Sequence, residues 1–406
     1  MRTIFAIAVV FALLLAGCDD GPAGDLTDPT DPADQTGHID PANPAVTWPA
    51  GLTAVSGQTL GDISLAAFAN DGGTPGAFSW TTPAASVGHD YGASTYSMTF
   101  TPTDRSAYHT VTDDVDVSVS IAMVLVQKGS FMMGQNGDGT VGNNVTPIKT
   151  VTLTQDFYMG KYEVTQAQWE AVMETTIQDM QLVAYPTDST NYGRGDAYPM
   201  YCVNWYEALA FCNKLSVMEG FSPAYSIEIN GEDKTNPDEW GEVPTSYSHE
   251  NYAQYQAVKR VTDSTGYQLP SEAQWEYAVK GGHKASDPPY IYPGSNRIGL
   301  VAWYSFNNGT SGTELYGAKR VGTKQANELG IHDMMGNARE WCLDSYASSR
   351  PAETDDPLLW GGANSNKNTR GDYWNGSSFP VNSSAYYPYL RHFMIGFRLV
   401  RPAVTQ

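Results

Sequence analysis

Cysteine and histidine are the candidate residues for redox or metal-binding chemistry in this chain, and few of them are spaced as such sites require. Apart from Cys18 there are three cysteines, Cys202, Cys212 and Cys342. Three cysteines allow at most one disulfide, and no CxxC or Cys/His spacing of the kind that binds zinc is present. Seven histidines occur, but no His-x₃-His pair lies beyond residue 121. Cys212 and Cys342 each sit in apolar surroundings and are predicted to be core residues.

The segment with the most distinctive chemistry runs from Tyr373 to Leu390 and contains no charged residue. Most of its residues are Tyr, Ser, Asn or Gly, the composition of an antibody paratope, where Tyr gives rigid contact area and the others adaptable hydrogen bonds. Prolines and a glycine within it exclude a long helix. Two interpretations stay open: a loop packed on its own domain, or an exposed binding surface held in place by a buried strand at 395–400.

Length and charge limit the classes of function. The chain has 406 residues, 41% of them hydrophobic, and a net charge of -21. This length allows two or three domains. The negative charge argues against nucleic acid as a partner and against electrostatic docking on anionic lipid, because both need a basic surface.

The first 44 residues have the features of export and tethering. Arg2 precedes an apolar run from Ile4 to Leu15, which is too short to span a membrane. The run continues into Leu15-Ala16-Gly17-Cys18, which resembles a bacterial lipobox. Residues 1–18 are therefore predicted to be a lipoprotein signal peptide with Cys18 as the acylated residue, and residues 19–44 a flexible linker. The expected location is a bacterial membrane, facing the periplasm or the cell surface.

Residues 45–120 and 121–404 differ in their sequence patterns and are predicted to be two domains. The first stretch has short apolar or β-branched runs near Val46, Leu60–Leu65, Phe78, Tyr96–Phe100 and Val115–Ser120, separated by Gly and Pro, and is predicted to be a small all-β Ig-like sandwich. Its sequence, in particular TWPAGLTAVSGQTLGDISL and SMTFTPTD, resembles the Ig-like repeats of bacterial surface proteins.

The second stretch, 121–404, is predicted to be α+β. Strands are expected over 123–126, 129–134 and 395–400, and residues 157–164 are expected to lead into a helix. Capping-box spacing predicts helices that begin after Thr165 and Ser271, and apolar periodicity predicts another from Trp205 to Leu215. Residues 218–262 are expected to be a polar, irregular insertion.

Motifs across residues 123–402 resemble one family in their order. They are FYMGKYEVTQAQW, PMYCVNWYEALAFCNKL, GYQLPSEAQWEYAV, VGTKQANELGIHDMMGNAREWC and IGFRLV. They are similar to the sulfatase-modifying-factor, or formylglycine-generating-enzyme, domain, which implies a variant of the C-type lectin fold. The family's enzymes bind copper through two cysteines near the C-terminus. The corresponding window, Arg370 to Arg398, contains no cysteine, so no copper is expected and oxidase activity is predicted to be lost.

The same resemblance implies a calcium site. In the family's Gly-Asn-x-x-Glu-Trp turn, the Asn and Glu side chains contribute ligands, and this chain has Asn337 and Glu340 at those positions. Hard oxygen ligands suit calcium. The alternative is a tight turn in which both side chains only make internal hydrogen bonds.

A second resemblance concerns the end of the chain. Tyr386 to Arg398 is similar to the variable region of surface proteins diversified by retroelements, which use the same lectin-type fold. Their variable positions are commonly encoded by AAC-type codons mutated at adenines, whereas Pro388, Arg391 and Ile395 onward match scaffold positions. The resemblance implies these ligand-binding residues: Asp372, Tyr373, Asn375, Ser377, Phe379, Tyr386, Tyr387, Tyr389, Leu390, His392 and Phe393.

Two classes of function follow from these patterns. The favoured one is a membrane-anchored binding protein, whose Tyr-rich face recognises a protein or another surface ligand. The alternative is a formylglycine-generating oxidase, or a related metal enzyme acting on a protein cysteine. A sugar-binding lectin would rest on analogy of fold alone.

Overall fold

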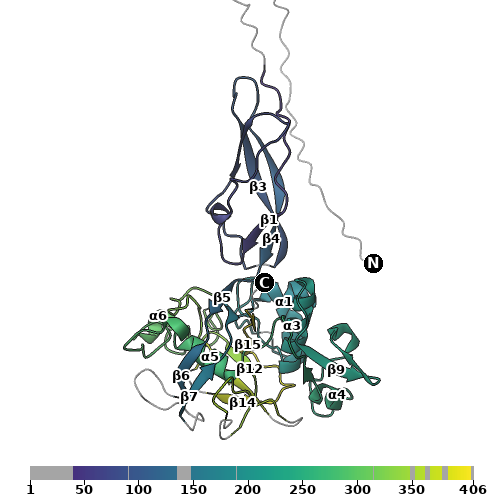
Figure 1. The fold of residues 1–406 in the computed structure, drawn as a ribbon, viewed down its shortest axis with the longest axis vertical. Helices are drawn as coiled ribbons and strands as arrows, with labels where there is room; N and C mark the ends of the chain where they lie inside the picture. Colours follow the sequence, from purple (N-terminus) through teal and green to yellow (C-terminus); the bar gives the residue numbers. More distant parts are fainter. Residues whose placement is uncertain are drawn as a thin grey trace, which may run out of the picture.

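The structure is a computed structural model. It describes residues 40–89, 91–134, 148–188, 190–313, 315–347, 353–361, 366–376 and 383–403. A slender β region stands on one side of a wider body of helices and short strands (Figure 1). Cys18, Ser377 and Phe379 lie outside the described residues, as do the predicted signal peptide and most of the predicted linker. Within the described ranges no helix is both long and apolar enough to cross a bilayer.

The slender region is a four-stranded sheet with the strand order β1-β4-β3-β2, in which β1 runs parallel to β4 and the other pairs are antiparallel. Its strands are β1 (Leu52–Val55), β2 (Gly76–Trp80), β3 (Gly92–Pro102) and β4 (Val111–Ser120). On β4, Val115, Val117 and Val119 are buried and their neighbours are not, because alternate side chains point to opposite faces. The all-β prediction is confirmed for this region.

Two details of this region differ from the prediction. The run at Leu60 forms a 3-10 helix, η2 (Leu60–Asp62), instead of a strand. Leu60 and Ile63 lie against the sheet as part of its core, together with Trp80 and Val87. Leu60 is therefore buried by a turn of helix instead of a strand. The second difference is that the described residues of this region form one four-stranded sheet, whereas a sandwich has two.

The β region meets the wider body through His89. Its ring contacts that of Tyr162 edge-on at 4.9 Å, and Ser56 Oγ lies 3.2 Å from its Nδ1. The hydroxyl of Thr165 donates to the His89 carbonyl oxygen at 3.1 Å. Thr165 is also the N-cap of the first helix of the body, so the junction is fixed where that helix begins.

The wider body contains several small sheets. A four-stranded sheet has the order β14-β13-β12-β15, and a three-stranded sheet has the order β16-β8-β5. Further strands form β10-β9-β11 and the pair β6-β7. The bounds are β5 (Met123–Val126), β6 (Gly129–Met133), β7 (Lys149–Leu153), β8 (Phe157–Gly160), β9 (Tyr225–Ile229), β10 (Glu232–Lys234), β11 (Lys259–Arg260), β12 (Arg339–Ser345), β13 (Lys367–Arg370), β14 (Ser384–Tyr386), β15 (Ile395–Phe397) and β16 (Val400–Pro402).

Helices begin where the capping boxes predict. Thr165 accepts from the Gln168 amide at the start of α1, and Ser271 accepts from the Gln274 amide at the start of α5. The predicted helix at Trp205 also forms, but it continues to Met218. The bounds are α1 (Gln166–Met173), α2 (Ile177–Ala184), α3 (Trp205–Met218), α4 (Tyr252–Gln256), α5 (Glu272–Val279) and α6 (Ile298–Val301), with 3-10 helices η3 (Pro237–Glu239) and η4 (Gly282–Lys284).

Residues 218–262 are more regular than predicted. They contain β9, β10, β11 and α4, and Tyr225, Ile227 and Tyr255 from this stretch are buried in the core around α3. Asn213 of α3 bonds the Tyr225 carbonyl oxygen at 2.7 Å and thereby attaches β9 to the helix. The insertion was predicted to be irregular because its buried positions are few and widely spaced in a polar sequence.

The predicted strand at 395–400 divides into two. β15 pairs in parallel with β12, whereas β16 pairs antiparallel with β8 in a different sheet. Between them Arg398 is fully buried and donates to Glu340, to the Gly160 carbonyl oxygen and to the His332 carbonyl oxygen. A buried guanidinium requires partners, and satisfying them turns the chain from one sheet to the next.

Candidate functional site

Both ends of the Tyr-rich segment are fixed by buried structure. At its start, Arg370 of β13 is fully buried and pairs with Glu272 at 2.6 Å and Glu276 at 3.0 Å. At its end, β15 is buried, and a side chain at Gly396 would lie 2.2 Å from the Met200 carbonyl oxygen. β14 returns alongside β13, with Lys367 opposite Tyr386. The described residues at both ends of the segment are thus attached to buried structure.

The described ligand-binding residues are exposed or half-buried, whereas two of the three predicted scaffold residues are buried and the third, Arg391, is half-buried. Tyr387 is 54% exposed, and Asn375 is also exposed. Pro388 and Ile395, assigned to the scaffold, are buried. The remaining described positions of the predicted site are half-buried: Asp372, Tyr373, Tyr386, Tyr389, Leu390, His392 and Phe393. None of these side chains is fully withdrawn into the core.

Ring contacts join many of these side chains into one aromatic cluster. His392 and Phe393 lie 4.4 Å apart, and His392 also contacts Tyr386 at 6.2 Å. Phe393 stacks on Tyr192 at 4.6 Å, and Tyr192 stacks on Trp374 at 5.8 Å. Such pairs contribute roughly 0.5–1.5 kcal/mol each beyond area burial. The cluster is therefore a rigid surface that presents ring edges and faces.

A second aromatic group lies farther along the loop. Tyr387 and Tyr389 stack at 5.3 Å with nearly parallel rings, and Tyr389 contacts Tyr252 edge-on at 5.6 Å. Because Tyr252 belongs to α4, the insertion at 218–262 supports this end of the face.

Arg339 is the cation within the predicted face. Its Nη2 donates to Asp372 Oδ1 at 2.6 Å, and its Nη1 donates to the Ser384 hydroxyl. Its guanidinium carbon lies 6.0 Å from the ring centres of both Tyr373 and Tyr386, within cation–π range. The ion pair neutralises the charge, and the two rings are held at a fixed distance from one another.

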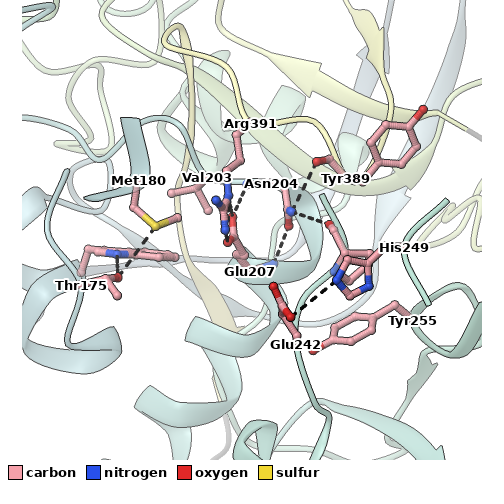
Figure 2. Close-up of polar contacts among 12 residues, drawn as sticks. Thr175, Met180, Val203, Asn204, Glu207, Glu242, His249, Tyr255, Tyr389 and Arg391 are labelled. Carbon is pink, nitrogen blue, oxygen red and sulfur yellow. Dashed lines mark hydrogen bonds and ion pairs between the residues drawn. The ribbon is translucent and has the colours of Figure 1, made fainter. Parts of the chain in front are cut away.

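The loop between Tyr387 and His392 is anchored to the start of α3 (Figure 2). Arg391 donates from Nε to Glu207 at 3.0 Å and makes a second bond from Nη2. Asn204, the N-cap of α3, lies 3.5 Å from the Tyr389 carbonyl oxygen, and the Trp205 amide donates to Pro388 O at 2.9 Å. These contacts fix the backbone, so the side chains of the loop can change without moving it.

The face carries little charge. Burial lowers the pKa of His392, so its imidazole is neutral at pH 7. Burial also raises the pKa of Tyr373 and of Tyr389, which keeps both phenols protonated. What the arrangement offers a ligand is aromatic area and neutral hydrogen-bonding groups.

A cavity of about 270 Å³ opens within the aromatic cluster. It combines three residues of the predicted site with side chains from two other loops. Its lining is Thr190, Tyr192, Ser311, Gly312, Tyr316, Tyr373, Trp374, Asn375 and Phe393.

Sequence reasoning missed Tyr192, Tyr316, Trp374 and Arg339 as parts of this face. Trp374 lies inside the uncharged segment, and its place there was the signal that could have identified it. Tyr192 and Tyr316 lie far away in the chain, and their Tyr/Asn/Gly surroundings were the signal that could have identified them. Arg339 lies between Asn337 and Glu340 in the sequence, and its side chain is only 11% exposed.

The proposed calcium ligands are engaged elsewhere. Glu340 is fully buried, and its two oxygens accept from Arg398 at 2.7 and 3.0 Å, while Oε2 also accepts from the Trp275 indole at 2.7 Å. Asn337 donates to Glu163 at 2.6 Å, and its Oδ1 accepts from the Lys319 amide at 2.7 Å. With their oxygens taken by these donors, the two side chains do not fit a calcium site in this arrangement.

The three described cysteines lie in surroundings that disfavour thiol reactivity. Cys202, Cys212 and Cys342 are free and buried, and burial raises the pKa of each thiol. Raised pKa values disfavour the thiolate, which is the nucleophile and the metal ligand. Across the ranges that the structure describes, no group of three or more His, Cys, Asp and Glu side chains could hold a metal ion.

Comparisons with known proteins agree with the fold. The model of the sulfatase-modifying factor enzyme 1-like domain matches residues 110–403. The chaperone protein LppX of Paenibacillus barcinonensis is 34% identical over 258 residues, which are 61% of this chain and 80% of that protein. The formylglycine-generating enzyme of Thermomonospora curvata is 25% identical over 255 residues, 59% of this chain and 78% of the enzyme.

Among solved structures, Treponema denticola variable protein 1 is similar, with a TM-score of 0.54 and 27% identity. The similarity covers 75% of this chain and 99% of that one. The resemblances to the sulfatase-modifying-factor domain and to variable proteins are thereby confirmed, together with the α+β, C-type lectin-like fold. Since the family match extends over well more than half of its length, this chain belongs to the sulfatase-modifying factor enzyme 1-like domain family.

Proposed function

We propose that this protein is a binding protein whose ligand meets the aromatic face between Asp372 and Phe393. The observation that carries the proposal is the exposure of the predicted ligand-binding residues on a fixed backbone. Those that the structure describes are exposed or half-buried, whereas Pro388 and Ile395 are buried and the half-buried Arg391 is ion-paired to Glu207. Such a surface can change its side chains while its backbone stays in place.

The chemistry of the face supports a protein ligand. Exposed aromatic clusters on a soluble surface are a liability unless a partner covers them. Tyr, Trp and Arg are the residues that most often dominate binding energy at protein interfaces, and this face places Tyr373 and Tyr386 at Arg339. The name of the Treponema protein, variable protein 1, agrees with diversification of this segment.

One test of the proposal requires no ligand. The coding DNA of residues 366–403 would be sequenced in many independent isolates of the source bacterium. We expect substitutions concentrated at adenines in the codons of the exposed and half-buried positions, with none at Pro388, Arg391 or Ile395. Substitutions spread evenly over the segment, or confined to silent positions, would refute the diversified face.

A second test addresses binding itself. A photoreactive benzoylphenylalanine would replace Tyr387 in the full chain on intact cells, with Tyr290, which is 40% exposed in the segment before α6, as the matched control position. We expect a discrete cross-linked partner from position 387 and not from position 290. Tyr387→Ser should then weaken binding of that partner and change the free energy of unfolding by less than about 0.5 kcal/mol. Equal cross-linking from both positions would contradict the assignment.

We also propose that the protein is held at the membrane by acylation of Cys18. The support is the lipobox-like Leu15-Ala16-Gly17-Cys18 after an apolar run. Two or more acyl chains anchor a protein stably, because each buried CH₂ contributes roughly 0.8 kcal/mol. The linker and the β region would then hold the aromatic face away from the bilayer.

A further inference from the structure

A protein ligand must contact more of the surface than the predicted ligand-binding residues. Each partner in a stable protein complex commonly contributes roughly 20–30 residues. The ligand-binding residues predicted between Asp372 and Phe393 are about half as many, and most of those that the structure describes are half-buried. A protein that binds this face must therefore also contact segments that lie beside it.

The large hydrophobic side chains with the greatest exposed fractions lie outside the segment proposed to vary. Among the described residues they are Phe306, Tyr247 and Leu315, with exposed fractions of 83%, 75% and 68%. Single exposed apolar side chains are common on protein surfaces, whereas a contiguous group of them marks an interaction site. The position of these three relative to the aromatic face therefore decides what they indicate.

Phe306 lies beside the start of the aromatic face. The amide of Ser305, the preceding residue, donates to the Gly376 carbonyl oxygen at 3.1 Å. Asn308, two residues later, is buried and donates from its side-chain amide to the Trp374 carbonyl oxygen at 2.8 Å. The backbone on both sides of Phe306 is thus attached to residues 374–376, which holds the exposed ring next to the face.

Leu315 belongs to the same side of the face as Phe306. Its carbonyl oxygen accepts from the Lys319 ammonium at 2.7 Å, which holds its backbone in place. The next residue, Tyr316, accepts at its hydroxyl from the Asn375 side-chain amide at 3.2 Å. Because Asn375 is one of the predicted ligand-binding residues, the apolar surface and the predicted site are continuous here.

Tyr247 lies beside another part of the face, the part that contains Tyr389. Asn204, the N-cap of α3, donates from its side-chain amide to the Pro244 carbonyl oxygen at 3.0 Å, and the same nitrogen lies 3.5 Å from the Tyr389 carbonyl oxygen (Figure 2). Burial raises the pKa of Tyr389, and the nearby Tyr247 phenol adds to the rise. The segment that carries Tyr247 therefore runs next to the variable segment.

From these positions, and resting on the proposed binding function, we propose that the protein partner of the aromatic face also contacts Phe306, Leu315 and Tyr247. The matching surface of the partner is an apolar patch, because these side chains carry no charge and two of them are aromatic, the type of residue that most often anchors protein interfaces. All three lie outside the segment proposed to vary. Their contribution to binding therefore stays the same when the variable side chains change.

The first test is photocross-linking in the full chain on intact cells. Benzoylphenylalanine is placed at position 306, 247 or 387, and we expect the same protein, identified by mass spectrometry, from all three. Met218 is the matched control position, since its side chain is 54% exposed, as is that of Tyr387. It lies at the far end of α3, about 20 Å along the helix from Asn204, and should not cross-link that protein.

The second test measures how much each contact contributes. The protein captured at position 387 is purified and titrated against the full chain carrying Phe306→Ser, Leu315→Ser or Tyr247→Ser, with Met218→Ser as the control. Each of the first three should weaken binding roughly 10- to 100-fold, the range for one large apolar side chain that the partner no longer buries. The control should bind like the wild type. All four should melt within about 2 °C of the wild type, because the substituted side chains are exposed.

The outcomes separate this inference from the proposed function. Cross-linking at position 387 but not at both 306 and 247, or wild-type affinity in any of the three variants, would overturn this inference and leave the proposed function standing. A protein captured at 306 and 247 but not at 387 would overturn the proposed function, and with it this inference. The absence of a cross-link at all three positions, or capture of the same protein at position 218, would overturn both.

Discussion

Replacing Glu340 with Gln distinguishes the two interpretations of the Asn337–Glu340 turn. Glu340 is fully buried, and its carboxylate pairs with the guanidinium of Arg398 at 2.7 Å. The substitution keeps the size of the side chain but replaces the carboxylate beside the fully buried Arg398 with a neutral group. Removing one partner of a buried ion pair costs about 3–5 kcal/mol.

This loss in free energy of unfolding should lower the melting temperature. For domains of this size each kcal/mol lowers the melting temperature by roughly 2–4 °C. Glu340→Gln should therefore melt roughly 6–20 °C below the wild type. The matched control is Glu170→Gln on the exposed side of α1. This substitution should change the melting temperature by less than about 2 °C, since surface substitutions are near neutral.

The assay is thermal unfolding with and without EDTA, followed by calcium titration. If Arg398 neutralises Glu340, EDTA leaves the wild-type melting temperature unchanged and calcium has no effect on either protein. A ligand that binds only the native state raises its stability by mass action. A wild type that EDTA destabilises, that calcium restores, and whose response is lost in Glu340→Gln would refute the ion-pair reasoning and establish the calcium site implied by the family.

Three further predictions concern separate parts of the chain. Burial lowers the pKa of His89 to about 4. Between pH 6.5 and 4 the imidazole binds a proton in the unfolded protein but not in the folded one, so stability should fall as the pH drops through this range. Thermal melts of His89→Gln should show a smaller loss of stability over the same range. Arg391→Ala leaves Glu207 buried without its counter-ion and should lower the free energy of unfolding by about 3 kcal/mol, measured by urea denaturation, whereas an unchanged midpoint would show that the pair does not hold the loop. Cys18→Ser should move the protein from the membrane fraction to the soluble fraction, and continued sedimentation with membranes would rule out acylation as the anchor.

Much of this protein follows from local signals in the sequence. The capping boxes at Thr165 and Ser271 locate two helices, because an N-cap hydroxyl and a Gln three residues later satisfy the same amides in any context. Alternation at Val115, Val117 and Val119 locates β4 in the same way. The uncharged composition of 373–390 was enough to single out the segment on which the proposed binding function rests.

Tertiary structure decided what those elements do together. Arg398 has no partner within its own strand, and only long-range packing brings Glu340, Gly160 and His332 to it and divides the predicted strand into β15 and β16. The cavity likewise joins Tyr192, Tyr316 and Trp374, which are more than fifty residues apart in the chain. Local patterns specify how a segment folds, but a binding face depends on contacts between distant segments, which no local pattern records.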